Sequence, residues 1–123
     1  MVLFVDINDV FRAPLAAALY RHTCGRTAHS AGIYVDEGAA LCEALCPPLL
    51  RGHRSRPLSA AMMEKADCVW CVTAAIARQL AETYPQHAHK LRAMADIADP
   101  FGMGGAAYAQ CERDIRAQME AMR

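Results

Sequence analysis

The start of the chain constrains the fold more than any other stretch. A short apolar run, Val2–Val5, is followed by the polar loop Asp6–Arg12, and a helical pattern, Ala13–Cys24, carries Pro14 in its first turn. Proline suits that position because its missing N–H would have no partner inside the helix. A strand, a loop and a helix in this order direct backbone N–H groups and the positive end of the helix dipole into the loop. The sequence therefore predicts an anion-binding cradle at residues 6–12.

The rest of the chain continues to alternate between strands and helices. Further strands are predicted at Thr27–Ala31, Asp67–Val72 and Lys90–Met94. Further helices are predicted at Gly38–Cys46, ended by Pro47-Pro48, at Ser59–Lys65, from an N-cap at Thr73 to Tyr84, and at Gly105–Met122. This alternation favours a parallel sheet covered on both faces. The predicted fold is α/β: one three-layer domain over residues 1–123, with a four-stranded parallel sheet and helices on both faces.

Composition excludes several classes of protein. The chain is 54% hydrophobic and 21% charged, with a formal net charge of zero, so it is globular and does not attract nucleic acid or an acidic membrane surface. No apolar run approaches the roughly 18 residues that span a bilayer, and the N-terminus lacks the pattern of a signal peptide. We therefore expect a cytoplasmic protein, and the oligomeric state stays open.

The six cysteines do not predict a disulfide scaffold or a metal site. Cys68 and Cys71 lie three apart on a predicted strand, so their side chains should face opposite sides. Cys42 and Cys46 lie four apart on a predicted helix and should share a face, but two thiols without further ligands make an incomplete zinc site. Core packing is the expected role of these residues. Trp70 is expected in the core as well.

Several segments, in order, resemble the low-molecular-weight protein tyrosine phosphatase family, which includes a group of arsenate reductases. Besides the loop at residues 6–12, the matching segments are Ser30-Ala31-Gly32, His53–Leu58, Ala66–Thr73, Asp96–Gly102 and the terminal helix with Tyr108, Cys111 and Ile115. The resemblance implies the α/β fold described above. It also implies a phosphate-binding loop that contains Arg12 and a general acid at Asp99. His53 is expected to be structural, bonded to backbone or to a neighbouring loop.

The departures from the family lie where chemistry would occur. The family loop reads Cys-x-Gly-Asn-x-Cys-Arg-Ser. Here Asp6 stands at the nucleophile, Asn8 at the glycine, Asp9 at the asparagine, Phe11 at the second cysteine and Ala13 at the serine. The thiolate that attacks phosphorus is therefore absent, and so is the hydroxyl that stabilises it.

These exchanges predict a cradle that binds phosphate weakly or not at all. Asp6 and Asp9 add negative charge, and like charges about 4 Å apart repel by roughly 4 kcal/mol at an effective dielectric near 20. We expect Asp6 to accept hydrogen bonds from loop N–H groups and to pair with Arg12, which would fill the site from inside. Asn8 is expected to need a positive φ, which asparagine tolerates with some strain.

The candidate site follows from the loop and from the resemblance. The predicted catalytic positions are Asp6, Arg12 and Asp99, and the predicted substrate-binding positions are Ile7, Asn8, Asp9, Val10, Phe11 and Phe101. No cofactor and no resident metal are predicted. Phe11 and Phe101 would form an apolar rim that favours a protein partner.

Two functions remain open at this point. The leading hypothesis is a catalytically impaired pseudophosphatase that binds a protein partner or a phosphoprotein. The alternative is an active phosphomonoesterase that uses Asp6 as nucleophile, as aspartyl-phosphate enzymes do, with Mg²⁺ held by Asp6, Asp9 and Asp99. Arsenate reduction is disfavoured because it also starts from the missing cysteine.

Overall fold

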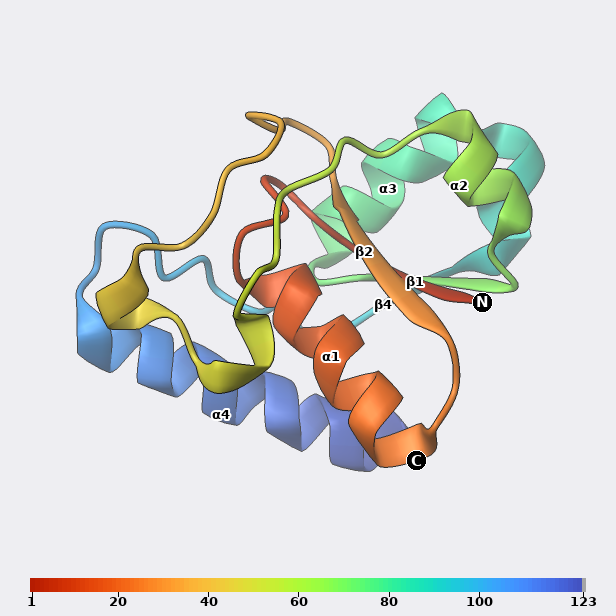
Figure 1. The fold of residues 1–123 in the computed structure, drawn as a ribbon. Coiled ribbons are helices and arrows are strands. Elements are labelled where there is room, and N and C mark those ends of the chain that lie inside the picture. The colour runs from red at the N-terminus through yellow and green to blue at the C-terminus, as the bar shows by residue number, and fades with distance from the viewer. Residues whose placement is uncertain (123) are drawn as a thin grey trace.

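The computed structural model describes residues 1–122 and contains a parallel sheet of four strands in the order β2-β1-β3-β4 (Figure 1). The strands are β1 (Val2–Asp6), β2 (Ala28–Gly32), β3 (Cys68–Cys71) and β4 (Leu91–Ala93). Each neighbouring pair runs parallel, with Val2 opposite both Ala28 and Cys68. The predicted α/β class and parallel sheet are confirmed.

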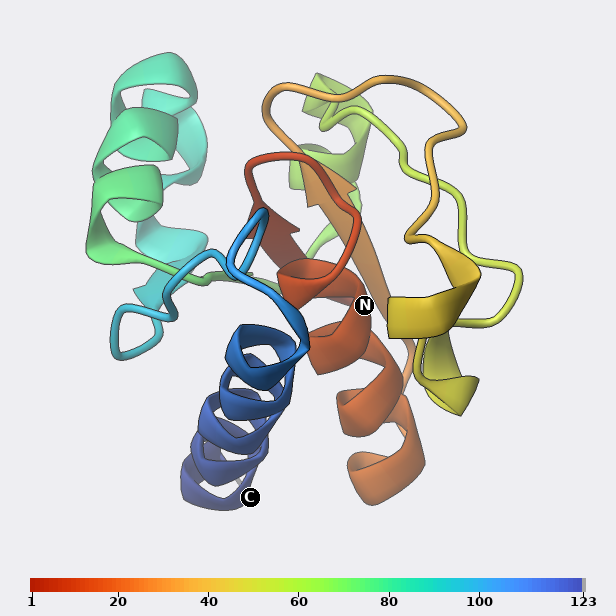
Figure 2. The same cartoon turned by 90° about the vertical axis from the view of Figure 1, so that its left-hand side faces the viewer.

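Helices cover both faces of this sheet. They are α1 (Arg12–Cys24), α2 (Ala60–Lys65), α3 (Ala74–Thr83) and α4 (Gly105–Met122). Figures 1 and 2 show α1 and α4 together on one face, and α2 and α3 on the other. The three-layer arrangement is therefore confirmed.

Two helices begin at the residues that the sequence indicated. The Oγ of Ser59 accepts a hydrogen bond from the N–H of Met62, and the Oγ1 of Thr73 accepts one from Ile76, each at 3.2 Å. A side-chain oxygen at the N-cap satisfies one of the donors that the first turn leaves free. The N-cap at Thr73 fixes the start of α3 immediately after β3.

The predicted helix at Gly38–Cys46 is wrong. Gly38 has a φ of 81°, outside the right-handed helical region. The segment forms only the short 3₁₀ helix η1 (Glu43–Leu45), and Pro48 starts a second one, η2 (Pro48–Leu50), instead of merely ending a helix. Cys42 and Cys46 therefore do not share an α-helical face. A third 3₁₀ helix, η3 (Pro85–Lys90), takes the residue at which the fourth strand was expected to begin.

The core lies between the sheet and the helices. Its largest fully buried side chains include Phe4, Leu3, Leu15, Met63 and Ile115. The placement of Trp70 in the core is only partly right, because burial alternates along β3 and Trp70 lies on its less covered face. All six cysteines are free. No helix within residues 1–122 is long and apolar enough to cross a membrane.

The end of β2 holds the loop that follows β1. The carbonyl oxygens of Asp6 and Ile7 accept hydrogen bonds from Ile33 at 3.1 Å and Tyr34 at 2.7 Å. Gly32 stands between these contacts, and a Cβ built there would lie 2.7 Å from the carbonyl oxygen of Ile7 and 2.8 Å from the nitrogen of Asp9. Glycine is needed here because the loop backbone passes too closely for any side chain.

Gly32→Ala should therefore lower the free energy of unfolding by about 2 kcal/mol or more, because backbone atoms must shift to admit the methyl group. Gly105→Ala is the matched control, since a Cβ at that first residue of α4 meets nothing within 4 Å. Urea denaturation of both variants checks this. An equal effect of the two substitutions would show that the close approach at Gly32 carries no cost.

Candidate active site

Asp6 is the last residue of β1 and is fully buried beneath the loop. Its Oδ1 accepts a hydrogen bond from the N–H of Asp9 at 2.7 Å, and its Oδ2 accepts one from Ala13 at 2.8 Å. One carboxylate thus joins the middle of the loop to the first turn of α1. The expectation that Asp6 accepts hydrogen bonds from loop N–H groups is confirmed.

Burial controls the titration of this carboxylate. Removal from water raises the pKa of Asp6 to about 6, although the hydrogen bonds from Ala13 and Asp9 lower it. The nearby charge of Asp9 raises the pKa further, and the charge of Arg12 has the smallest effect. At neutral pH Asp6 is therefore mainly ionised, at a cost that its two hydrogen bonds only partly offset.

Arg12 does not pair with Asp6, and that expectation is wrong. Its Nη1 donates to the carbonyl oxygen of Ile97 at 2.9 Å, and its Nη2 lies 3.6 Å from Oδ2 of Asp99. No ion pair joins Arg12 to Asp6 within residues 1–122. Both oxygens of Asp6 are already bonded to backbone N–H groups, whereas the guanidinium of the buried Arg12 has its acceptors in the loop after β4.

Asp99 is therefore brought to the loop, as the resemblance implied. Its Oδ2 faces Arg12, and its Oδ1 accepts a hydrogen bond from the N–H of Phe101 at 3.1 Å. The Asp99 side chain is 45% exposed, so it stands at the mouth of the site. Such a residue could donate a proton to a leaving group, but the same contacts also serve as an ordinary turn.

The loop reverses direction at Asp9 and not at Asn8. Asp9 has a φ of 53° and is the only non-glycine residue with positive φ within residues 1–122. Aspartate is among the residues that tolerate this region because its short side chain can bond locally. The expected strain at Asn8 is therefore wrong.

Asp9 is anchored by the segment His53–Arg56. Its Oδ2 accepts a hydrogen bond from the N–H of Arg56 at 2.9 Å, and its carbonyl oxygen accepts one from the hydroxyl of Ser55 at 2.8 Å. That carbonyl also lies 2.8 Å from Nε2 of His53. The structural role predicted for His53 is confirmed. The carboxylate of Asp9 faces this segment, yet its negative charge still raises the pKa of Asp6 beneath the loop, as expected of two like charges.

The contact with Asp9 changes the pKa of His53. Burial of the ring lowers the pKa of His53, but its hydrogen bonds to Asp9 and the charge of that carboxylate leave the pKa raised above the usual value of 6.5. The Oδ1 of Asp9, in contrast, is buried without a hydrogen-bond partner.

The loop keeps part of its capacity to bind an anion. The N–H groups of Val10, Phe11 and Arg12 have no acceptor within the described chain. They precede or open α1, where the helix dipole favours negative charge. However, the negative charge of Asp6 lies directly beneath them, so part of this capacity is already used.

A cleft of about 790 Å³ opens beside the loop. Of the residues predicted to bind substrate, Asn8, Val10 and Phe101 line this cleft, whereas Ile7, Asp9 and Phe11 do not. Phe11 is not a rim residue, because it is buried edge-on against Tyr108 with ring centroids 4.9 Å apart. Phe101 is 75% exposed at the cleft.

Sequence reasoning missed much of this cleft. Tyr34 lines it with 70% of its surface exposed, and Leu41 and Leu45 come from the segment that was expected to be helical. No motif marks these residues. The only sequence signal is the position of Tyr34 just after a predicted strand. The structure then shows that its N–H donates to the loop at Ile7.

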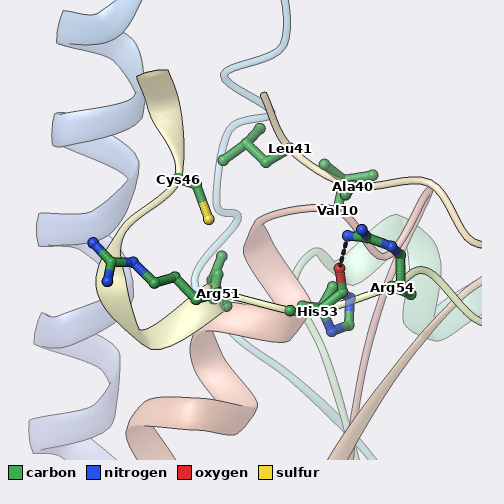
Figure 3. A pocket seen from close by; sticks show the side chains of 9 residues that line it. Val10, Ala40, Leu41, Cys46, Arg51, His53 and Arg54 are labelled. Carbon is green, nitrogen blue, oxygen red and sulfur yellow. Dashed lines mark hydrogen bonds between the residues drawn. The ribbon is translucent and has the colours of Figure 1, made fainter. Parts of the chain in front are cut away.

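A smaller cavity of about 280 Å³ lies on another side of Val10. Figure 3 shows the thiol of Cys46 near Leu41 at this cavity, and the guanidinium of Arg54 turned back onto the carbonyl of His53. That hydrogen bond is 3.1 Å long. The guanidinium of Arg51 points away, toward α4.

The three acidic residues considered for a metal do not converge. Within residues 1–122, no three His, Cys, Asp or Glu side chains are grouped closely enough to hold a metal ion. The carboxylate of Asp9 faces the segment beyond β2, and that of Asp99 faces Arg12. The convergence of Asp6, Asp9 and Asp99 that Mg²⁺ binding required is therefore not found.

Comparison with known proteins decides the family. The model of the low molecular weight phosphotyrosine protein phosphatases matches residues 1–123, the whole chain. The chain belongs to this phosphatase family. No curated protein sequence matches it closely enough to count as a relative.

Solved structures of phosphatases resemble this family member closely. The YwlE arginine phosphatase from Geobacillus stearothermophilus is 26% identical, with a TM-score of 0.88 over 98% of this chain and 88% of its own. The low molecular weight protein tyrosine phosphatase from T. tengcongensis is 25% identical, with a TM-score of 0.86 over 98% and 95%. The tyrosine phosphatase Wzb from Escherichia coli K30, in complex with phosphate, is 19% identical, with a TM-score of 0.89 over 98% and 94%, and shows the shared fold.

The buried carboxylate predicts a distinctive dependence of stability on pH. The pKa of Asp6 is raised from 3.8 to about 6 in the folded chain, so the folded state binds this proton more tightly than the unfolded state does. The contribution of Asp6 to stability is therefore fully present below pH 3.8 and is lost as the pH rises toward 6. At about 1.4 kcal/mol per pKa unit, the loss is roughly 3 kcal/mol.

Urea denaturation of the native chain and of Asp6→Asn between pH 4.5 and 7.5 would measure this change. The native chain should lose stability relative to the variant as the pH rises, and the change should end near pH 6 to 7. A relative stability that increases with pH would mean that the two N–H groups hold the pKa below 3.8 and would contradict the prediction.

Proposed function

We propose that this chain is a catalytically impaired phosphatase, a pseudophosphatase of the cytoplasm, that binds a protein partner or a phosphoprotein. The observation that carries the proposal is Asp6, a fully buried carboxylate at the nucleophile position of the family. Both of its oxygens are engaged by backbone N–H groups, of Asp9 and of Ala13.

Three features oppose turnover. The hydrogen bonds from Asp9 and Ala13 hold both oxygens of Asp6 against the loop backbone and stabilise its charge, which lowers the reactivity of the carboxylate toward phosphorus. The charge of Asp6 also repels a phosphate dianion at the point where it would bind. Finally, Ala13 lacks the hydroxyl that the family uses beside the nucleophile. The loop therefore keeps the backbone shape of the family without the thiol and the hydroxyl that the family uses for attack on phosphorus.

The cleft beside the loop supports a binding role. Two exposed aromatic side chains, Tyr34 and Phe101, stand at an opening of about 790 Å³. Exposed aromatic residues at a cleft favour contact with an apolar or aromatic side chain of another protein. Two similar solved structures with 25% identity or more are, by name, an arginine phosphatase and a protein tyrosine phosphatase, which supports a phosphorylated protein as the class of ligand.

The lack of disulfide pairing among the six cysteines of the described chain supports a cytoplasmic location. All six are free, including the exposed Cys24 and Cys42. Free thiols persist in reducing compartments, whereas secreted domains of this size commonly pair them.

The enzymatic alternative, in which Asp6 attacks phosphorus with the help of Mg²⁺, is less well supported. A carboxylate can act as nucleophile in aspartyl-phosphate enzymes. However, the metal in such a reaction needs several oxygen ligands, and the carboxylates of Asp9 and Asp99 are turned to other partners. The hydrolysis experiment described next distinguishes this enzymatic function from the proposed binding function.

The test is hydrolysis of p-nitrophenyl phosphate by the purified chain, with and without Mg²⁺. The native chain should show no turnover under either condition. The double variant Asp6→Cys, Ala13→Ser should hydrolyse the substrate at least about a hundredfold faster than the background rate. A thiolate would restore the attack on phosphorus, and Asp99 could then protonate the leaving group.

Ala117→Cys is the matched control, because it places a new thiol at an exposed position of α4, away from the loop. It should leave the rate at background. Turnover by the native chain that requires Mg²⁺ and is lost in Asp6→Asn would overturn the proposal and establish an aspartate-based enzyme. A silent double variant would show that the loop cannot support catalysis even with the thiol.

A further inference from the structure

A third cavity, of about 380 Å³, lies along the free edge of β2, and none of the loop residues 6–12 lines it. Its polar lining comes from Arg21, His29, Ser30, His53 and Arg56, together with Arg51. No acidic side chain lines it within the described chain. Positive charge is therefore concentrated here, although the chain as a whole has a net charge of zero.

The backbone of β2 presents polar groups to this cavity. The N–H of Gly32 donates to the carbonyl of Arg56, and the carbonyl of Gly32 accepts from Leu58, so Gly32 directs its backbone groups away from β1. Residues two apart on a strand face the same way. Ala28 and Ser30 therefore also turn their N–H and C=O groups toward the open edge.

Two arginines are fixed along this edge. Arg21 donates from Nη1 to the carbonyl of Ala28 at 2.8 Å, and Arg56 donates from Nη2 to the carbonyl of Ser30 at 3.5 Å. These carbonyls lie two residues apart, which corresponds to about 7 Å along a strand. Each guanidinium has five N–H donors, and these contacts leave most of them free.

Ser30 adds a neutral hydroxyl beside the two arginines. Only 4% of this residue is exposed, and it lines the cavity. Capping of the strand edge would explain the contacts of the two arginines, but it would not explain why no acidic side chain lines the cavity within the described chain.

The titration of His29 agrees with a positive potential at this edge. Burial lowers the pKa of His29, and the charges of Arg56 and Arg21 lower it further. Both arginines are thus close enough to act on the same ring.

We propose that this cavity binds the phosphate group of a phosphate monoester between Arg21 and Arg56, with the hydroxyl of Ser30 as a further donor. A phosphate monoester brings three acceptor oxygens and a charge of about −1.5 to −2, which matches two guanidinium groups better than a single carboxylate does. The site is separate from the loop at residues 6–12, so it does not depend on the function proposed for that loop.

The test is a titration of the ¹⁵N-labelled chain with inorganic phosphate, at constant ionic strength maintained with chloride. Saturable shifts should appear at the amides of residues 28–30 and of Arg56. Arg56→Gln should weaken binding about tenfold, because a charge-assisted hydrogen bond is lost while the backbone contacts of Arg56 to Asp9 and Gly32 remain. Arg21→Gln should act in the same direction.

Arg54→Gln is the matched control. Arg54 is also exposed and lies two residues before Arg56, but it donates to the carbonyl of His53 and lines another cavity. Its removal should leave phosphate binding unchanged. Equal weakening in the two variants, shifts confined to residues 10–13, or no saturation at residues 28–30 would each overturn the proposal.

A blocked phosphoserine tripeptide would identify the source of the phosphate group. Binding about tenfold tighter than that of inorganic phosphate would support a phosphorylated protein, and equal binding would support a small phosphate compound. Either result supports the proposed site, provided that Arg56→Gln weakens the binding of the tripeptide.

Discussion

The carboxylate of Asp6 is the interaction on which the candidate site depends. It accepts hydrogen bonds from the N–H groups of Asp9 and Ala13, and so ties the loop after β1 to the start of α1. A negative group at this point meets donors and a helix dipole that would otherwise face an external anion. The chain thus carries a built-in anion, which preserves the shape of a phosphate loop while occupying part of it.

The loop also has supports that do not involve a nucleophile. Asp9 takes the one positive φ outside glycine within residues 1–122, and the segment His53–Arg56 holds it in place through backbone and side-chain contacts. Because Gly32 has no side chain, the end of β2 packs directly against the loop backbone. Because these contacts do not involve the carboxylate of Asp6, they hold the loop independently of the side chain at position 6.

The sequence predicted the elements whose signals are local. The order of strands and helices, the N-cap at Thr73 and the start of the short helix near Ser59 followed from residue patterns, and the parallel sheet followed from that order. The partner of Arg12 could not be predicted in this way, because its acceptors lie in the loop after β4 and depend on tertiary placement. The α-helix predicted at Gly38–Cys46 does not form. Gly38 has a positive φ, and the sequence alone does not reveal that conformation. The place of Tyr34 at the cleft likewise depends on tertiary structure.

The most direct test of the built-in anion is a crystal structure determined near pH 7 in the presence of phosphate. This account predicts that the carboxylate of Asp6 stays bonded to the N–H groups of Asp9 and Ala13, and that no phosphate binds to those of Val10, Phe11 and Arg12. A phosphate ion within hydrogen-bond distance of these three groups, with Asp6 displaced or protonated beneath it, would contradict it. The loop would then be a working phosphate site.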